Sequence, residues 1–479
     1  MVSVDPTMGR QLFGRGAVYT LASVAQMAAG VLAIPAATRL LSTAEFGTVA
    51  LVIVVMQLSA MLGAVGLPGA ITRAYFSASN GGSATRELIG ASAVSAAVFV
   101  LVAGGVAAVW GTSFGIATWG PGLWYGLLAG CLLSVVHACQ ALLRAQNRAA
   151  RYVLVSIASS VGGHVTGVGL VVVVAPTAEL YAIGLLSGVV VGLVIALVST
   201  GVSWPARMAT LRWGLAIGLP TVPHLVSRFA MEMGDRVVIE WHLGLEAVGE
   251  YQVAYQIGAL GMMLIGAVNN AWSPLYFGAP DEQRAGLLAL TSSWLHHLAA
   301  LGAVGIACGS PIAVIIAAPP TYSRAELVPI ASVVAFSAIA QVTYLGRVNL
   351  LFQHERTRSL LWVTPSLAVA NLALNVALVP RYGLMAAASV TVLVYLLQGV
   401  LLELVSRRME LIPWHRRAEA GAYAFALVGC SAGAVLPVDG LWLGLRILIV
   451  LFCLAAGLVA LRRMIGVATS PVTSPPSAG

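Results

Sequence analysis

The residues best suited to chemistry lie on one face of a single apolar stretch, residues 213–241. They recur at three- and four-residue spacing and are Thr221, His224, Arg228, Glu232 and Asp235. At about 100° per residue they fall within an arc of roughly 80–100° of a helix, and apolar side chains fill the opposite face. Guanidinium suits bidentate contact with phosphate, and an imidazole beside a carboxylate can bind a proton. We therefore predict an anion-binding face with a titratable His–Glu pair.

Arg228 lies near the middle of this stretch, because a helix rises about 1.5 Å per residue. Burying an arginine in a bilayer costs roughly 2.5–3.5 kcal/mol on insertion scales. Pairing with Glu232, four residues away, offsets only about 0.2–0.5 kcal/mol of this. A wet cavity or an anionic ligand would explain the site, and the alternative is a structural ion pair between helices. Glu232 lies about one turn further out, and Asp235 approaches the external interface.

Two further arginines lie near the ends of other apolar stretches. Arg347 shares a helical face with Thr343 and His354, and Arg73 closes the second stretch. Each is placed to contact phosphate at the inner mouth of a transport path or, alternatively, to extend toward the lipid headgroups. The predicted substrate-binding residues are therefore Arg228, Glu232, His224, Arg347, Arg73 and Asp235. We predict no catalytic residue, no metal site and no cofactor.

Apolar stretches long enough to cross a bilayer must position these residues. Charged residues make up only 9% of the chain and its mean hydropathy is +0.93, which excludes a water-soluble globular protein. Because a span needs roughly 20 apolar residues, we predict an all-α, polytopic membrane protein with about 14 transmembrane helices. The predicted spans are residues 14–40, 45–70, 87–110, 117–143, 152–175, 179–200, 213–241, 247–275, 286–318, 326–352, 359–379, 383–405, 418–436 and 441–461.

The arginines concentrate on alternate connections between the predicted spans, and the chain has no lysine. Basic loops resist translocation, so this distribution predicts that both termini are cytoplasmic. The net charge of +8 then describes the inner face of a membrane, and we predict no nucleic-acid partner. The connections on the opposite side are short, which leaves no external domain to carry out catalysis.

A short internal repeat suggests how the spans are grouped. Residues 40–51 (LLSTAEFGTVAL) and 243–254 (LGLEAVGEYQVA) each follow an odd-numbered span, and Gly47 aligns with Gly249. Parallel repeats recur in transporters, with the substrate site at the interface between the halves. We predict two pseudo-symmetric six-helix lobes followed by two additional spans and a disordered tail. The predicted boundaries are residues 1–205, 206–408, 409–466 and 467–479.

Three segments carry a resemblance to a known family. They are residues 9–51, which contain the element LSTAEFG at residues 41–47, residues 65–76 (VGLPGAITRAYF) and residues 234–255 (GDRVVIEWHLGLEAVGEYQVAY). The chain resembles bacterial polysaccharide-biosynthesis flippases, the lipid-linked oligosaccharide (O-antigen type) members of the multidrug/oligosaccharidyl-lipid/polysaccharide exporter superfamily. The resemblance implies a V-shaped pair of lobes around a cavity that opens alternately to the two sides, in the bacterial plasma (inner) membrane.

The same resemblance implies a substrate and partners. Such proteins are not enzymes, and they move an undecaprenyl-pyrophosphate-linked oligosaccharide from the inner to the outer leaflet for cell-surface polysaccharide biosynthesis. Cationic residues in the cavity are expected to hold the pyrophosphate. Further expected partners are membrane lipids, a proton or sodium ion for coupling, and the polysaccharide polymerase machinery. The pair formed by His224 and Glu232 is our candidate for proton coupling.

Three alternatives remain open. A cation-coupled multidrug exporter of the same superfamily would need a membrane carboxylate, for which Glu232 is the candidate because the first six predicted spans contain no deep one. A membrane-embedded polysaccharide polymerase or ligase generally needs a sizeable external loop, and the sequence offers only short ones. A passive scaffold does not account for a polar face that carries arginine, glutamate and histidine.

Overall fold

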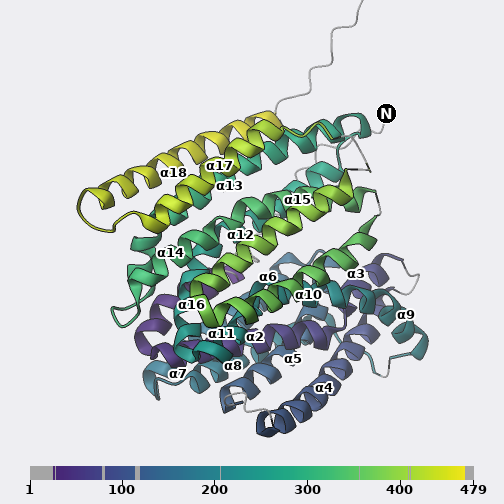
Figure 1. Ribbon diagram of the computed structural model, residues 1–479. Helices are drawn as coiled ribbons and strands as arrows, with labels where there is room; N and C mark the ends of the chain where they lie inside the picture. The colour runs from purple at the N-terminus through teal and green to yellow at the C-terminus, as the bar shows by residue number, and fades with distance from the viewer. Residues whose placement is uncertain are drawn as a thin grey trace, which may run out of the picture. The chain divides into compact units, whose positions relative to one another are not determined.

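The computed structural model describes residues 25–469 except residues 27, 78–80, 114–118, 205, 355, 408, 410 and 411. Every regular element in this part of the chain is a helix (Figure 1), which confirms the all-α prediction. Eleven of the described helices are long and apolar enough to cross a membrane. The chain is therefore a multi-pass membrane protein.

The chain forms two compact units, and four helices pass from one unit into the other. Unit 1 comprises Met1–Gln256, Val314–Leu327 and Thr357–Val394, and unit 2 comprises Ile257–Ala313, Val328–Arg356 and Tyr395–Gly479. The elements wholly in unit 1 are α2 (Thr43–Ala64), α3 (Leu67–Ser77), α4 (Gly81–Ser113), α5 (Pro121–Ala145), α6 (Ala149–Ser156), η1 (Ile157–Val161), α7 (Gly162–Val173), α8 (Ala178–Thr200), α9 (Met208–Gly218), η2 (Leu219–Thr221), α10 (Val222–Met233), α11 (Asp235–Leu243) and η3 (Thr357–Ser359). Those wholly in unit 2 are α15 (Ser337–Gln353), α17 (Arg416–Val435) and α18 (Gly440–Thr469), and the four shared helices are α12 (Leu245–Phe277), α13 (Asp281–Ala317), α14 (Arg324–Ala335) and α16 (Leu360–Ser406). The lobe boundaries given by the sequence repeat stay predictions.

The difference between eleven helices and the predicted fourteen spans has three sources. The first predicted span, residues 14–40, lies partly outside the described residues. Its described part includes Ala28–Leu40, a helix that is apolar but too short to be counted as a span. The seventh is divided into α9, η2, α10 and α11. The eleventh and twelfth are joined in α16 across Gly383, whose φ of 64° and ψ of −152° suit glycine. The count of fourteen stays a prediction.

Proline explains the first break in the seventh predicted span. Pro220 lies in the 3-10 turn η2, and Pro223 follows at the start of α10. Proline has no N–H to donate and its ring clashes with the preceding turn, so the α-helix tightens here. A second break follows at Gly234, between α10 and α11. The polar face predicted for this span is therefore divided among η2, which holds Thr221, and the two short helices α10 and α11.

The LSTAEFG element acts as a helix-capping motif. The Ser42 hydroxyl accepts a hydrogen bond from the Glu45 N–H at 3.2 Å, which begins α2 as an N-cap should. The Glu45 carboxylate also accepts a hydrogen bond from the backbone N–H of Ala178, in the first turn of α8. A negative charge is stabilised at a helix N-terminus. These contacts join the start of α2 to the start of α8 within unit 1.

The two copies of the sequence repeat pack against each other at their aligned glycines. A Cβ atom on Gly47 would lie 1.9 Å from the Leu245 carbonyl oxygen, and one on Gly249 would lie 2.2 Å from the Thr43 carbonyl oxygen. Both neighbours are backbone atoms of unit 1, so only glycine fits at either position without moving a helix. Small residues allow such close approach where lipid supplies no hydrophobic drive for association.

In unit 2, α13, α17 and α18 lie side by side (Figure 1). Val304 and Cys308 of α13 form a buried cluster with Cys453 of α18. The Arg446 guanidinium of α18 is only 1% exposed and donates to the carbonyl oxygens of Gly433, at 2.9 Å, and of Leu436, at 2.5 Å. A cation thus satisfies the carbonyl groups that the end of α17 leaves free.

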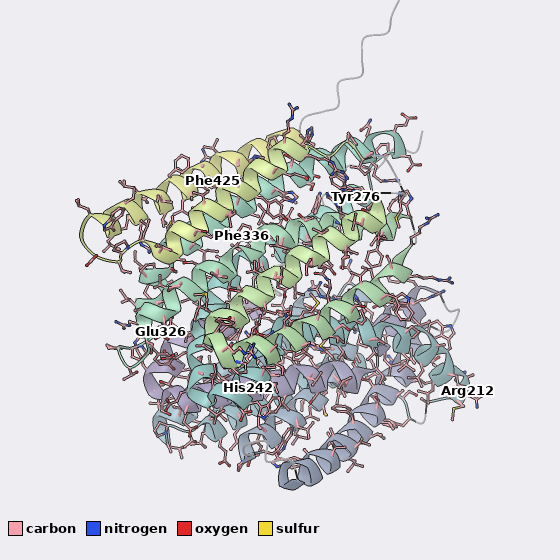
Figure 2. The ribbon with its side chains drawn as sticks, viewed as in Figure 1. Arg212, His242, Tyr276, Glu326, Phe336 and Phe425 are labelled. Atoms are coloured by element: carbon pink, nitrogen blue, oxygen red, sulfur yellow. The ribbon has the colours of Figure 1, made fainter. Side chains whose placement is uncertain are left out.

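Apolar side chains also occupy the outer surface of unit 2. Phe425 of α17 is 41% exposed, whereas Phe336, just before α15, is buried and lies edge-on to Tyr423 of α17 (Figure 2). An exposed phenylalanine on an apolar helix suits contact with lipid. The same helix therefore presents one face to the membrane and another to its neighbours.

Candidate functional site

The predicted polar face begins with Thr221 in η2 and continues on α10. His224, Arg228 and Glu232 follow one another at four-residue spacing and are all half-buried. The imidazole of His224 interacts electrostatically with Arg228. It also interacts with the backbone of Leu360, the first residue of α16. Three of the six predicted substrate-binding residues are therefore placed together on one helix of unit 1.

Asp235, the last residue of the predicted face, is part of a buried network. Its carboxylate binds the Arg236 guanidinium at 2.6 Å and accepts a hydrogen bond from the Tyr251 hydroxyl at 2.6 Å. Arg236 in turn donates to Gln252 at 3.1 Å and lies 4.1 Å from the ring centroid of Tyr255. Asp235 is 1% exposed and Arg236 is fully buried.

This network ties α11 to α12 and engages both oxygens of the Asp235 carboxylate. Its position along the predicted span suggested that Asp235 approaches the external interface. In the structure its side chain is buried inside unit 1 and forms an ion pair with Arg236. An unpaired charge in such a place would be costly, and the two charges neutralise each other. The contact of Asp235 with substrate stays a prediction. Arg73 differs, because it is exposed on α3.

Arg347 is the centre of a second charged cluster, in unit 2. Its guanidinium is 4% exposed, lies 2.6 Å from the Glu403 carboxylate and is stacked 3.5 Å from the ring centroid of Trp414. The carboxylate of Glu419 lies further away, at 3.9 Å from Arg347. Glu403 also binds Arg416, at 2.8 Å. We call these five residues the Arg347 cluster.

The sequence did not reveal the partners of Arg347. Glu403 lies at the end of α16 and Glu419 in the first turn of α17, both at the edges of predicted spans. An acidic residue at such an edge is usually solvated, and nothing in its spacing points to an arginine more than fifty residues earlier. The sequence offered only a weaker signal. Glu403 and Glu419 lie at the two ends of one basic connection, and Trp414 lies within it.

A group of amides and hydroxyls lies near the Arg347 cluster in unit 2. The Ser273 hydroxyl of α12 hydrogen-bonds to Asn269 at 3.3 Å and to Asn349 of α15 at 3.1 Å. Asn349 donates to Asn269 at 3.3 Å. The Trp272 indole donates to Thr291 of α13 at 2.8 Å. These contacts join three helices, which is the usual role of polar side chains within a membrane.

Comparison with known proteins places the chain by family and by fold. Residues 14–278 match the family model described as polysaccharide biosynthesis protein. A comparison with curated proteins gives no match.

Solved structures share the fold at low sequence identity. The lipid II flippase MurJ in its inward closed conformation is 13% identical, with a TM-score of 0.69 over 93% of this chain and 99% of that chain. An inward-facing multidrug resistance transporter of the MATE family and MOP superfamily is 13% identical, with a TM-score of 0.63 over 84% and 98%. A MOP superfamily transporter from Pyrococcus furiosus is 13% identical, with a TM-score of 0.56 over 88% and 96%.

Proposed function

The chain belongs to the polysaccharide biosynthesis protein family, and we propose that it is a flippase for an oligosaccharide linked to undecaprenyl pyrophosphate. It moves this lipid from the cytoplasmic to the outer leaflet of the bacterial plasma membrane by alternating access, for cell-surface polysaccharide biosynthesis. The observation that carries the proposal is Arg228, a half-buried guanidinium on the polar face of α10, inside the family-matched region. The fold, shared with a lipid flippase, supports it.

The chemistry of the headgroup suits this face. Pyrophosphate carries negative charge on several oxygens, and a planar guanidinium can bind two of them at once. His224, one turn before Arg228, adds a second donor to an anion, and Glu232, one turn after it, offers the guanidinium an alternative partner once the anion has left. In this proposal Arg228 holds the pyrophosphate while the sugar and the lipid move past it.

Arg73 is proposed as the earlier contact. It is exposed on α3, and α3 follows Gly66, where a Cβ atom would lie 2.1 Å from the Gly218 carbonyl oxygen at the end of α9. The helix that carries Arg73 is thus packed near the helix that leads into η2 and α10. Two arginines of unit 1 can therefore meet the same headgroup in succession.

A cation-coupled multidrug exporter is the second candidate, because Glu232 is a half-buried carboxylate in a chain with the fold of MATE transporters. A fold shared at 13% identity does not separate the two functions. The substrate does, since a drug cation would meet Glu232 and a pyrophosphate would meet Arg228.

The test is complementation of a host deleted for this protein, with surface polysaccharide as the readout. Arg228→Ala should abolish the polymer while the protein level in the membrane is unchanged, and Arg228→Lys should restore it only in part, because an ammonium cannot make the bidentate contact. Arg212→Ala is the matched control: Arg212 is an exposed arginine of the preceding helix α9 (Figure 2). It should leave polymer yield intact.

Two results would remove the proposal. One is a normal polymer yield from the Arg228→Ala variant. The other is a deleted host that loses drug resistance but keeps its surface polysaccharide, and that regains the resistance with the wild-type chain but not with the Glu232→Gln variant.

A further inference from the structure

Unit 2 holds a chain of buried, hydrogen-bonded groups that the proposed transport site does not use. It runs from Glu419 of α17 through Ser292 to His296 of α13, then to Thr343 of α15 and back to Tyr423 of α17. His296 is fully buried and Glu419 is 9% exposed. Ionisable side chains inside a membrane are costly and typically mark ion or proton pathways.

The distances make this chain continuous. The Ser292 hydroxyl donates to the Glu419 carboxylate at 3.4 Å and lies 3.4 Å from Nδ1 of His296, which is itself 3.8 Å from that carboxylate. Nε2 of His296 lies 2.9 Å from the Thr343 hydroxyl, which lies 2.7 Å from the Tyr423 hydroxyl. Three helices of unit 2 therefore meet through groups that can each gain, lose or redirect a proton.

Glu419 is the carboxylate that lacks a close cation. Arg347 lies 2.6 Å from Glu403 but 3.9 Å from Glu419, and Arg416 lies 2.8 Å from Glu403. The nearby positive charge is thus directed mainly at Glu403. Glu419 is therefore a buried carboxylate in the first turn of α17 whose charge is only weakly neutralised.

The imidazole can respond to a proton without losing a contact. Nδ1 of His296 lies 2.7 Å from the Ser292 carbonyl oxygen, so Nδ1 carries a hydrogen and Nε2 is the acceptor in the neutral ring. A proton on Nε2 would donate to the Thr343 hydroxyl, which would then donate to Tyr423. The Tyr423 hydroxyl can donate in turn to the Ile339 carbonyl oxygen, which lies 3.4 Å away.

We propose that the Glu419–His296 pair binds one exchangeable proton and is the coupling site of the transporter. This inference rests on the proposed flippase function. The charged or titratable groups around the pair are Arg347 of α15, Glu403 of α16, Arg416 and Tyr423 of α17, and His297 of α13. The site differs from the His224–Glu232 pair in unit 1 and uses α17, which follows the twelve spans predicted for the two lobes.

His297 provides a matched control on the same helix. Its Nδ1 bonds to the Ser293 carbonyl oxygen at 2.8 Å, and it lines a separate groove with Trp294 and Phe452. Adjacent residues of a helix point in different directions. His297 is therefore a titratable neighbour outside the hydrogen-bonded chain.

The experiment uses the full chain in vesicles of phosphatidylethanolamine and phosphatidylglycerol, with a fluorescently labelled oligosaccharide on undecaprenyl pyrophosphate as the probe. Flipping is measured with and without an imposed pH gradient. The wild type and His297→Gln should flip the probe and be accelerated by the gradient. Glu419→Gln and His296→Gln should keep the gradient-free rate and lose the acceleration.

A second measurement needs no transport. The thermal midpoint of the detergent-solubilised protein is followed against pH, since a proton bound differently by folded and unfolded chains makes stability depend on pH. Glu419→Gln and His296→Gln should remove an inflection that His297→Gln retains.

The outcomes separate the two proposals. A wild type that never flips the probe defeats the proposed function, and the pH dependence of the midpoint then still decides whether the proton site exists. Acceleration by a pH gradient that survives both substitutions overturns the coupling site while leaving the flippase intact. Acceleration by a sodium gradient alone overturns it as well.

Discussion

Replacing Gly47 by alanine gives the sharpest test of the packing in unit 1. The new Cβ would lie 1.9 Å from the Leu245 carbonyl oxygen, whereas ordinary contact begins at 3.4 Å, so α2 and the start of α12 must separate by about 1.5 Å. Both sides of this contact are backbone, and no side chain can rotate away. Overpacking of this kind costs typically about 1–3 kcal/mol, and we expect the upper part of that range.

Gly249→Ala should act through the same gap. Its Cβ would lie 2.2 Å from the Thr43 carbonyl oxygen, which requires a separation of about 1.2 Å. Because one opening of the helix pair relieves both clashes, the Gly47→Ala/Gly249→Ala double variant should be less destabilised than the sum of the single variants.

The assay is thermal unfolding in detergent, read with a thiol-reactive dye. All five cysteines are buried and free, so each becomes reactive only when the protein opens. Gly69→Ala on α3 is the control, because its Cβ would meet nothing within 4 Å. Alanine in an open helical position stabilises by roughly 0.5–1 kcal/mol relative to glycine. A Gly47→Ala midpoint at or above that of Gly69→Ala would refute the reasoning.

Further substitutions test two ion pairs and the arginine that binds the carbonyl groups at the end of α17. Arg236→Met leaves the buried Asp235 carboxylate without its cation and should cost about 3–5 kcal/mol, while adding Asp235→Asn should recover part of the loss; a double variant no more stable than the single one contradicts this. Arg446→Met removes charged hydrogen bonds to the end of α17 and should cost about 1.5–3 kcal/mol, seen as a lower thermal midpoint; an unchanged midpoint would show that the carbonyl groups find other donors. Glu87→Gln should cost less than about 1 kcal/mol, because its partner Arg207, 2.9 Å away, is 62% exposed although Glu87 itself is only 8% exposed; a loss as large as that of Arg446→Met would show that the solvent exposure of Arg207 does not weaken this pair.

Some of the site could be predicted from the sequence because its signal is local. The common face of His224, Arg228 and Glu232 follows from helical periodicity, and the structure keeps the three on α10. His296 and His297, adjacent on α13, point in different directions as helical geometry requires, since one contacts Thr343 and the other lines a groove. Periodicity did not predict the break at η2, where local proline geometry divides the span.

Other features depend on residues far apart in the chain. Asp235 has a neighbouring arginine that the sequence shows, but its burial comes from Tyr251 and the packing of α11 on α12. Arg347 meets Glu403 and Trp414 only because α16 and the connection after it return to α15. The closeness of Gly47 and Gly249, which the sequence merely aligned, is likewise a fact of packing.

Composition and periodicity alone determined that this chain is an all-helical membrane protein, because apolar runs of bilayer length have no other stable form in lipid. The segments that resemble a known family could also be recognised without coordinates, because the residues of each segment are contiguous in the sequence. Tertiary structure decided which charges are paired, which glycines touch and where the histidines point. Those properties depend on distances between side chains of different helices. The energies of hydrogen bonds and of charge pairs change within a few ångströms, and the order of residues along the chain does not specify distances that small.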